Sequence, residues 1–112
     1  MGGKAARRKG SRVERQIVKL HREVDIKAKR VPLSGAAEGY KGDIIVELSK
    51  GDTLQGEIKA RKAGSGFTVI DGWLGDNDIL FLKRDQRRPA VYMNWGTYQR
   101  LLEYVKRNRE TE

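Results

Sequence analysis

Two short segments in the middle of the chain alternate between apolar and polar side chains, and this pattern restricts the fold more than any other. The segments are 43–48 (DIIVEL) and 54–61 (LQGEIKAR), with the turn-forming residues SKGDT between them. Because successive side chains of a strand point to opposite faces, the pattern predicts a β-hairpin with one apolar face. A register with Leu48 opposite Leu54 places the even-numbered residues on that apolar face.

The odd-numbered face of this hairpin carries charged side chains. In the same register, Asp43 lies opposite Lys59 and diagonal to Glu57, which is close enough for the three side chains to converge. Two carboxylates beside an ammonium group suit Mg²⁺, which takes oxygen ligands and keeps several waters. A metal there would activate water for phosphodiester hydrolysis, while Lys59 orients that water or stabilises transition-state charge. The alternative is an ordinary ion pair on a solvated face, which contributes only ~0–1 kcal/mol.

A helix is predicted to begin at Ser11, after which apolar residues recur every three or four positions. Ser11 and Glu14 fit the capping box that starts many helices, so the Glu14 carboxylate has a structural role available to it. A functional role, at the metal site or its waters, is the second interpretation of Glu14. The apolar stripe of this helix consists of Val13, Ile17, Leu20 and Val24.

The rest of the chain predicts further strands and helices around one central layer. Residues 32–42 (PLSGAAEGYKG) predict a loop, and a loop of this length inside a small domain is often functional. The element order predicts an α/β fold with a mixed central sheet flanked by helices. We expect one domain over 11–112, preceded by a flexible basic arm over 1–10. The other predicted elements are strands at 25–31, 79–82 and 90–95 and helices near 67–74 and 97–107.

Positive charge is concentrated at the beginning of the chain. The net charge is +9, from 24 basic and 15 acidic residues, and residues 1–30 contain eleven of the basic residues and three of the acidic ones. A concentrated basic surface attracts polyanions, and nucleic acid is the most common of them. An anionic membrane surface and a merely soluble basic protein are the other interpretations.

Composition excludes several kinds of chemistry. The chain has no cysteine and one histidine, which rules out disulfides, thiolate zinc sites and thiol nucleophiles and argues against a catalytic Ser-His-Asp triad. Carboxylates, lysine and hydroxyls must therefore carry any catalysis, and no organic cofactor is expected. No apolar run approaches the roughly 20 residues that cross a bilayer, and no secretion signal is present, so we expect a cytoplasmic protein without a membrane partner.

Four sequence pieces occur in order within residues 9–62: KGSRVERQIVKL, RVPLSG, GDIIV and GEIKARK. Together they resemble the PD-(D/E)XK nuclease superfamily, which has a restriction-endonuclease-like core. More narrowly, they resemble the archaeal-type Holliday junction resolvases and their phage relatives. The chain departs from the motif in having Gly42 instead of proline before Asp43, and beyond Lys62 it looks more like the phage or bacterial relatives.

The resemblance implies roles for particular residues. Glu14, Asp43, Glu57 and Lys59 would form the metal-dependent catalytic site, with the Ile58 carbonyl as a further metal ligand. It also implies that Arg15, beside the helix glutamate, and Ser34, in the loop, matter for activity. The metal would be Mg²⁺, with Mn²⁺ able to substitute. The cations expected to contact DNA are Arg7, Arg8, Lys9, Arg12, Arg15, Arg30, Lys41, Arg61 and Lys62.

The activity implied by the resemblance is the resolution of four-way DNA junctions by paired symmetric nicks, in recombination and repair, at the nucleoid or in a phage-infected cell. Two symmetric cuts imply a homodimer. Another nuclease of the superfamily, such as a nickase or a branched-DNA nuclease, and a non-catalytic basic nucleic-acid-binding module remain the alternatives. The residues that would either hold the dimer together or complete the core are Phe67, Ile70, Trp73, Leu74 and Phe81.

Overall fold

A computed structural model of the chain describes residues 2–32, 39, 42–62, 64 and 66–111, and it describes side chains from Gly10 to Arg109 within those ranges. The residues form two compact units. The sheet unit comprises the residues up to Ala60 and those from Leu102 onward, and the hairpin unit comprises Arg61–Leu101.

Helix α1 (Gly2–Glu23) begins nine residues before the predicted start at Ser11. The capping-box prediction is therefore wrong: Ser11 lies inside the helix, where its hydroxyl accepts a hydrogen bond of 3.1 Å from the Arg15 guanidinium. Residues 2–10 continue the helix and do not form the separate arm that we expected. The physical reason is helix propensity, since the segment KAARRK consists only of strong helix formers.

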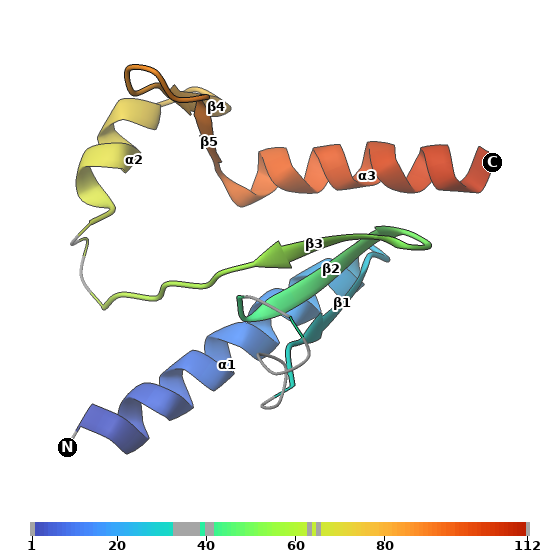
Figure 1. The fold of residues 1–112 in the computed structure, drawn as a ribbon, viewed down its shortest axis with the longest axis horizontal. Helices are drawn as coiled ribbons and strands as arrows, with labels where there is room; N and C mark the ends of the chain where they lie inside the picture. Colours follow the sequence, from blue (N-terminus) through green and yellow to red (C-terminus); the bar gives the residue numbers. More distant parts are fainter. Residues whose placement is uncertain (1, 33–38, 40–41, 63, 65, 112) are drawn as a thin grey trace. The chain divides into compact units, whose positions relative to one another are not determined.

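Three antiparallel strands form the sheet of the sheet unit, in the order β1 (Lys27–Arg30), β2 (Ile44–Ser49) and β3 (Asp52–Gly56) (Figure 1). Val46 lies opposite Leu54, so β3 is shifted by two residues from the predicted register. The turn between β2 and β3 is shorter than predicted, because Ser49 already pairs with Asp52. A two-residue shift leaves every side chain on its predicted face, because the side-chain period of a strand is two.

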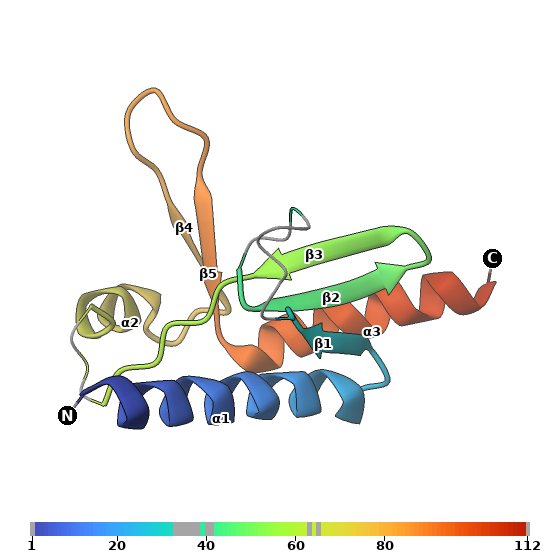
Figure 2. The ribbon, with the colours of Figure 1, turned by 60° about the horizontal axis from the view of Figure 1, so that its bottom comes forward.

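Helix α1 lies alongside the sheet, next to β1 (Figure 2), and the even-numbered face of the sheet is largely buried. Ala28, Ile44 and Val46 are buried there, together with Val18 of the helix. Ile45 is also buried, on the odd-numbered face, so part of that face is covered.

The later turns of α3 (Trp95–Thr111) complete the sheet unit. The Arg109 guanidinium donates a hydrogen bond of 3.1 Å to the Leu48 carbonyl, and the Lys106 ammonium lies 3.2 Å from the Asp25 carboxylate. Within the described residues, none of the helices has a continuous apolar stretch that could cross a membrane.

The hairpin unit contains α2 (Thr68–Leu74), the antiparallel strands β4 (Ile79–Leu82) and β5 (Ala90–Met93), and the first turns of α3. The Asn94 side chain caps α3 by accepting the Thr97 N–H at 2.9 Å. The expected α/β class is thus confirmed, although every strand pair of the described residues is antiparallel, where we expected a mixed sheet.

A hydrogen bond of 2.6 Å from the Tyr92 hydroxyl to Asp71 Oδ1 ties β5 to α2. This bond, with smaller contributions from desolvation and from the charge of Asp71, raises the pKa of Tyr92 above its ordinary value. Only the protonated phenol donates the bond. Its contribution to stability is therefore present below the ordinary tyrosine pKa and is lost as the pH rises through the raised one.

We expect the Asp71→Ala variant to lower the pKa of Tyr92 toward the ordinary tyrosine value, as followed by ultraviolet absorbance during an alkaline titration. A Tyr92→Phe variant identifies which part of the absorbance change belongs to Tyr92. If the pKa of Tyr92 is the same in the Asp71→Ala variant as in the wild type, the two side chains are not hydrogen-bonded.

Candidate functional site

Asp43 sits where three strand ends meet. It directly precedes β2, its N–H donates to the Gly56 carbonyl at 2.7 Å, and its carbonyl accepts the Val31 N–H at 2.9 Å. Gly56 ends β3, and Val31 follows the last residue of β1. The Asp43 side chain turns toward the segment after β3, since Asp43 Oδ2 accepts a hydrogen bond of 2.7 Å from the Ile58 N–H. The carboxylate of Asp43 is thus held beside residues 57–59.

Gly42 permits this arrangement of the backbone. Its φ is +79°, in the region that side chains rarely adopt, and a Cβ added there would lie 2.7 Å from the Gly56 carbonyl oxygen. Glycine is the residue without a Cβ, so it allows β2 to enter the sheet this close to the end of β3. The position of Asp43 therefore depends on the glycine before it.

Glu57 and Lys59 form an ion pair, with 3.3 Å between Oε1 and Nζ. Their side chains are 56% and 63% exposed, so the attraction adds little to stability and both groups remain accessible to a ligand. Both residues follow the end of β3, in a segment outside the sheet. The predicted position of Lys59 directly opposite Asp43 is therefore wrong, but the bond to Ile58 still brings Asp43 beside both residues.

Glu14 contacts the same end of the sheet through Arg30. Its Oε1 accepts a hydrogen bond of 2.9 Å from Arg30 Nε, and Arg30 is the last residue of β1. The next residue, Val31, is the one that bonds to the Asp43 carbonyl. The capping interpretation predicted that the Glu14 carboxylate accepts a backbone N–H at the start of the helix. In the structure the carboxylate pairs instead with the Arg30 guanidinium.

The oxygen atoms at this strand end fit a hard divalent cation. Within the described residues, no group of three or more histidine or acidic side chains is placed to hold a metal ion. Mg²⁺ does not need such a group, because it binds through one or two carboxylates together with waters and phosphate oxygens. Asp43, whose carboxylate accepts the Ile58 N–H, and Glu57, the residue before Ile58, are two carboxylates that could serve such an ion.

A basic groove of about 450 Å³ runs between α1 and β1. Three of its cations, Lys19, Arg22 and Lys29, were not predicted to contact DNA. The spacing of Arg15, Lys19 and Arg22 places them on one helix face, and this could be recognised in the sequence. That β1 lies next to this face could not. The groove is lined by Arg15, Val18, Lys19, Arg22, Lys29 and Arg30.

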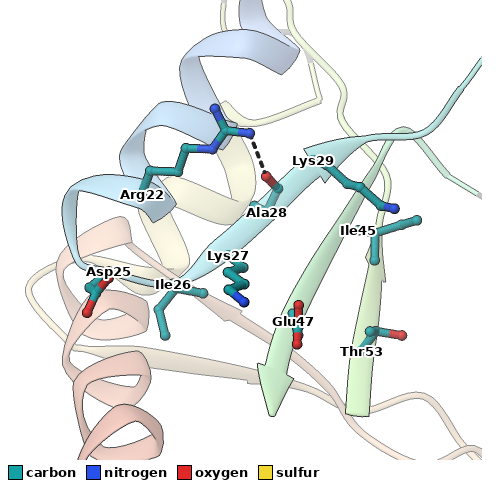
Figure 3. A pocket seen from close by; sticks show the side chains of 9 residues that line it. All are labelled: Arg22, Asp25, Ile26, Lys27, Ala28, Lys29, Ile45, Glu47 and Thr53. Atoms are coloured by element: carbon teal, nitrogen blue, oxygen red, sulfur yellow. Dashed lines mark hydrogen bonds between the residues drawn. The ribbon is translucent and has the colours of Figure 1, made fainter. Parts of the chain in front are cut away.

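A second hollow, of about 520 Å³, shares Arg22 and Lys29 with the basic groove (Figure 3). Arg22 donates a hydrogen bond of 3.2 Å to the Ala28 carbonyl, which fixes its guanidinium against the edge of β1. Lys27 also lines this hollow, together with Glu47 on the neighbouring strand. Because Asp25 also lines it, this hollow carries charges of both signs, unlike the basic groove.

Among the described residues, the others predicted to contact DNA do not line either hollow. Arg12, Arg61 and Lys62 are exposed. Ser34 and Lys41 lie outside the described residues, as do the side chains of Arg7, Arg8 and Lys9.

Residues 5–70 match the family of archaeal Holliday junction resolvases (Hjc). The match covers 66 of the 112 residues and includes Glu14, Asp43, Glu57 and Lys59. No curated protein and no solved structure matches the chain. The resemblance and the restriction-endonuclease-like core that it implied are confirmed. The chain belongs to the archaeal Holliday junction resolvase family.

Proposed function

We propose that this resolvase is a Mg²⁺-dependent endonuclease that cuts four-way DNA junctions by paired symmetric nicks. The observation that carries this proposal is the bond of 2.7 Å between Asp43 Oδ2 and the Ile58 N–H, which sets one carboxylate beside Glu57 and Lys59. Family membership supports branched DNA as the substrate. The metal and the residue roles are those that the family resemblance implies, and the dimer is what two symmetric cuts imply.

Asp43 and Glu57 would hold the metal, with the Ile58 carbonyl as a further ligand. The Ile58 N–H fixes the orientation of the Asp43 carboxylate through Oδ2 and leaves Oδ1 available to the cation. When bound, Mg²⁺ supplies positive charge beside the scissile phosphate and promotes the ionisation of water.

Lys59 and Glu14 act at the same strand end in different ways. The Lys59 ammonium orients the attacking water or stabilises the charge that develops on the phosphate. Glu14 is a positioning residue, because its carboxylate holds the Arg30 guanidinium at 2.9 Å. Arg30 in turn lines the basic groove, where it can bind a phosphate next to the one that is cut.

The cations of the basic groove would bind the DNA backbone. Five of its six lining side chains are positively charged, which suits a row of phosphates. Contacts to phosphates position a duplex without reading its bases. Recognition of the junction by shape is therefore expected.

The proposed dimer uses apolar side chains of the hairpin unit. Trp73 and Phe81 are 62% and 66% exposed, and Val91, which pairs with Phe81 across β4 and β5, is also exposed. Phe81 and Val91 are adjacent, and adjacent exposed apolar side chains are the feature that marks an interaction surface. Leu74 is buried and belongs to the core, so it is not an interface candidate.

We expect the double variant Trp73→Ala/Phe81→Ala to weaken dimerisation by about a thousand-fold, since central aromatic residues each contribute about 2 kcal/mol to an interface. Sedimentation equilibrium over a range of protein concentrations measures the dissociation constant. Tyr104→Ala serves as the control, because Tyr104 is a similarly exposed aromatic residue on α3. An unchanged dissociation constant, or a wild-type protein that stays monomeric, would contradict the proposed interface.

The substrate is tested by comparing a four-way junction, a flap, a linear duplex and single-stranded DNA in the presence of Mg²⁺. We expect paired nicks at symmetric positions near the branch point of the junction and little cleavage of the other three. Preferred cutting of the flap, or single nicks in the duplex, would assign the chain a different nuclease activity.

A further inference from the structure

The turn that joins β4 to β5 gathers positive charge that the site described above does not use. Over residues 71–96 the chain has four basic and four acidic side chains and is neutral overall. All four basic residues lie in the turn, residues 83–89, and three of the four acidic residues lie outside it. The four cations of this basic turn are Lys83, Arg84, Arg87 and Arg88.

The basic turn is exposed, and its charge is not neutralised. Each of its residues is exposed to solvent. The ion pairs formed by the described side chains lie elsewhere, between Arg30 and Glu14, Lys59 and Glu57, and Lys106 and Asp25. Asp85 is the single acidic residue within the turn, so the turn has a local charge of +3. A surface of this kind attracts polyanions.

The backbone holds the basic turn in a defined shape. Leu82 pairs with Ala90 at the end of the ladder, and the Arg87 N–H donates to the Arg84 carbonyl at 3.2 Å. At the other end of the strands, the Tyr92–Asp71 hydrogen bond ties the hairpin to α2. An ordered turn loses less conformational entropy when it binds a partner, which makes its charges more effective.

We propose that the basic turn is a second DNA-binding element, which contacts the phosphate backbone of a duplex arm of the substrate. The proposal rests on DNA being the substrate, as in the proposed function. It involves different residues, because the turn lies beyond the region of 5–70 that matches the family. A two-stranded antiparallel ribbon is narrow enough to lie along a DNA groove, where phosphates flank it on both sides.

The test measures binding of a labelled four-way junction and a linear duplex, without Mg²⁺, over a range of salt concentrations. We expect Arg87→Ala/Arg88→Ala to weaken both complexes on the order of ten-fold at low salt and to reduce the salt-dependence slope by about 1.8, which corresponds to two lost phosphate contacts. Both complexes should respond alike, because backbone contacts do not depend on sequence or branching.

Two matched variants separate this role from a general effect of charge or of folding. Lys50→Ala/Arg100→Ala also removes two exposed cations, but from outside the basic turn, and should leave the slope unchanged. Arg87→Lys/Arg88→Lys keeps the charge and should keep most of the slope. Equal slopes for the alanine variant of the turn and the wild type, or an equal loss in the Lys50/Arg100 control, would overturn the proposal.

The same protein samples are also assayed for cleavage of the junction after Mg²⁺ is added. A wild type that binds through the basic turn but does not cleave would contradict the proposed nuclease activity and still support the turn as a DNA contact. A wild type that cleaves, together with a turn variant of unchanged affinity and slope, would overturn only the inference about the turn.

Discussion

The Asp43→Asn variant is expected to cleave a four-way junction about a thousand-fold more slowly than the wild type, since a metal ion contributes several kcal/mol to transition-state stabilisation. The amide is a far weaker ligand for a hard cation than the carboxylate. Its oxygen can still accept the Ile58 N–H, so the strand end should keep its structure. Junction affinity should therefore stay within a few-fold of the wild type. Single-turnover cleavage and binding titrations measure the two quantities separately.

Asp52→Asn is the matched control for this experiment. Asp52 is an exposed acidic residue of the same sheet, at the far end of β3 from the candidate site. The control should cleave at the wild-type rate, and urea unfolding should show that both variants remain folded. Cleavage by Asp43→Asn at near the wild-type rate would remove Asp43 from the metal site.

The Gly42→Ala variant is expected to lower the free energy of unfolding by about 3 kcal/mol, from backbone strain together with steric overlap. The added Cβ would meet the Gly56 carbonyl oxygen at 2.7 Å, at a residue whose φ is +79°. Relief of this overlap must move the start of β2 away from β3. The movement should displace Asp43, so cleavage should fall even under conditions in which the variant is fully folded.

Gly51→Ala separates the two causes. Gly51 also has a positive φ, of +82°, but no atom lies within 4 Å of an added Cβ. This variant should therefore lose about 1 kcal/mol, from backbone strain alone, and should keep its activity. Urea denaturation of both variants gives the comparison. Equal losses for Gly42→Ala and Gly51→Ala would show that Gly42 does not lie close to the end of β3.

The faces of the central hairpin could be predicted from the sequence, whereas its register could not. Alternation has a period of two, so it places Ile44 and Val46 on one face whichever even-numbered shift the strands adopt. The register depends on the turn, and SKGDT contains more than one place to reverse the chain. In the structure Lys50 and Gly51 make a two-residue turn, in which Gly51 has a positive φ that glycine adopts without steric cost.

The gathering of Asp43 with Glu57 and Lys59 was predictable in outline only. All three have the same parity along the hairpin, which suggested a common site. The bond from Asp43 to the Ile58 backbone lies beyond the last paired residues of the ladder, where no periodic pattern applies. The contact of Glu14 with Arg30 joins residues 16 positions apart in sequence and depends on how α1 packs on the sheet.

The start of α1 shows a different limit. Residues 1–10 are small and basic and suggested a flexible arm, but alanine, lysine and arginine are strong helix formers and residues 2–10 are helical. The helix side of the basic groove could be predicted from the sequence, because the cations of α1 that line it are regularly spaced. Lys29 and Arg30 complete it only after β1 folds back beside the helix.

The most direct test of the proposed chemistry is the cleavage of a labelled four-way junction by the wild-type protein, with Mg²⁺ and with the metal chelated. Product is expected only with Mg²⁺, as two nicks at positions related by the symmetry of the junction. Binding without cleavage at every Mg²⁺ concentration, or equal cleavage after chelation, would contradict a metal-dependent site at Asp43 and Glu57.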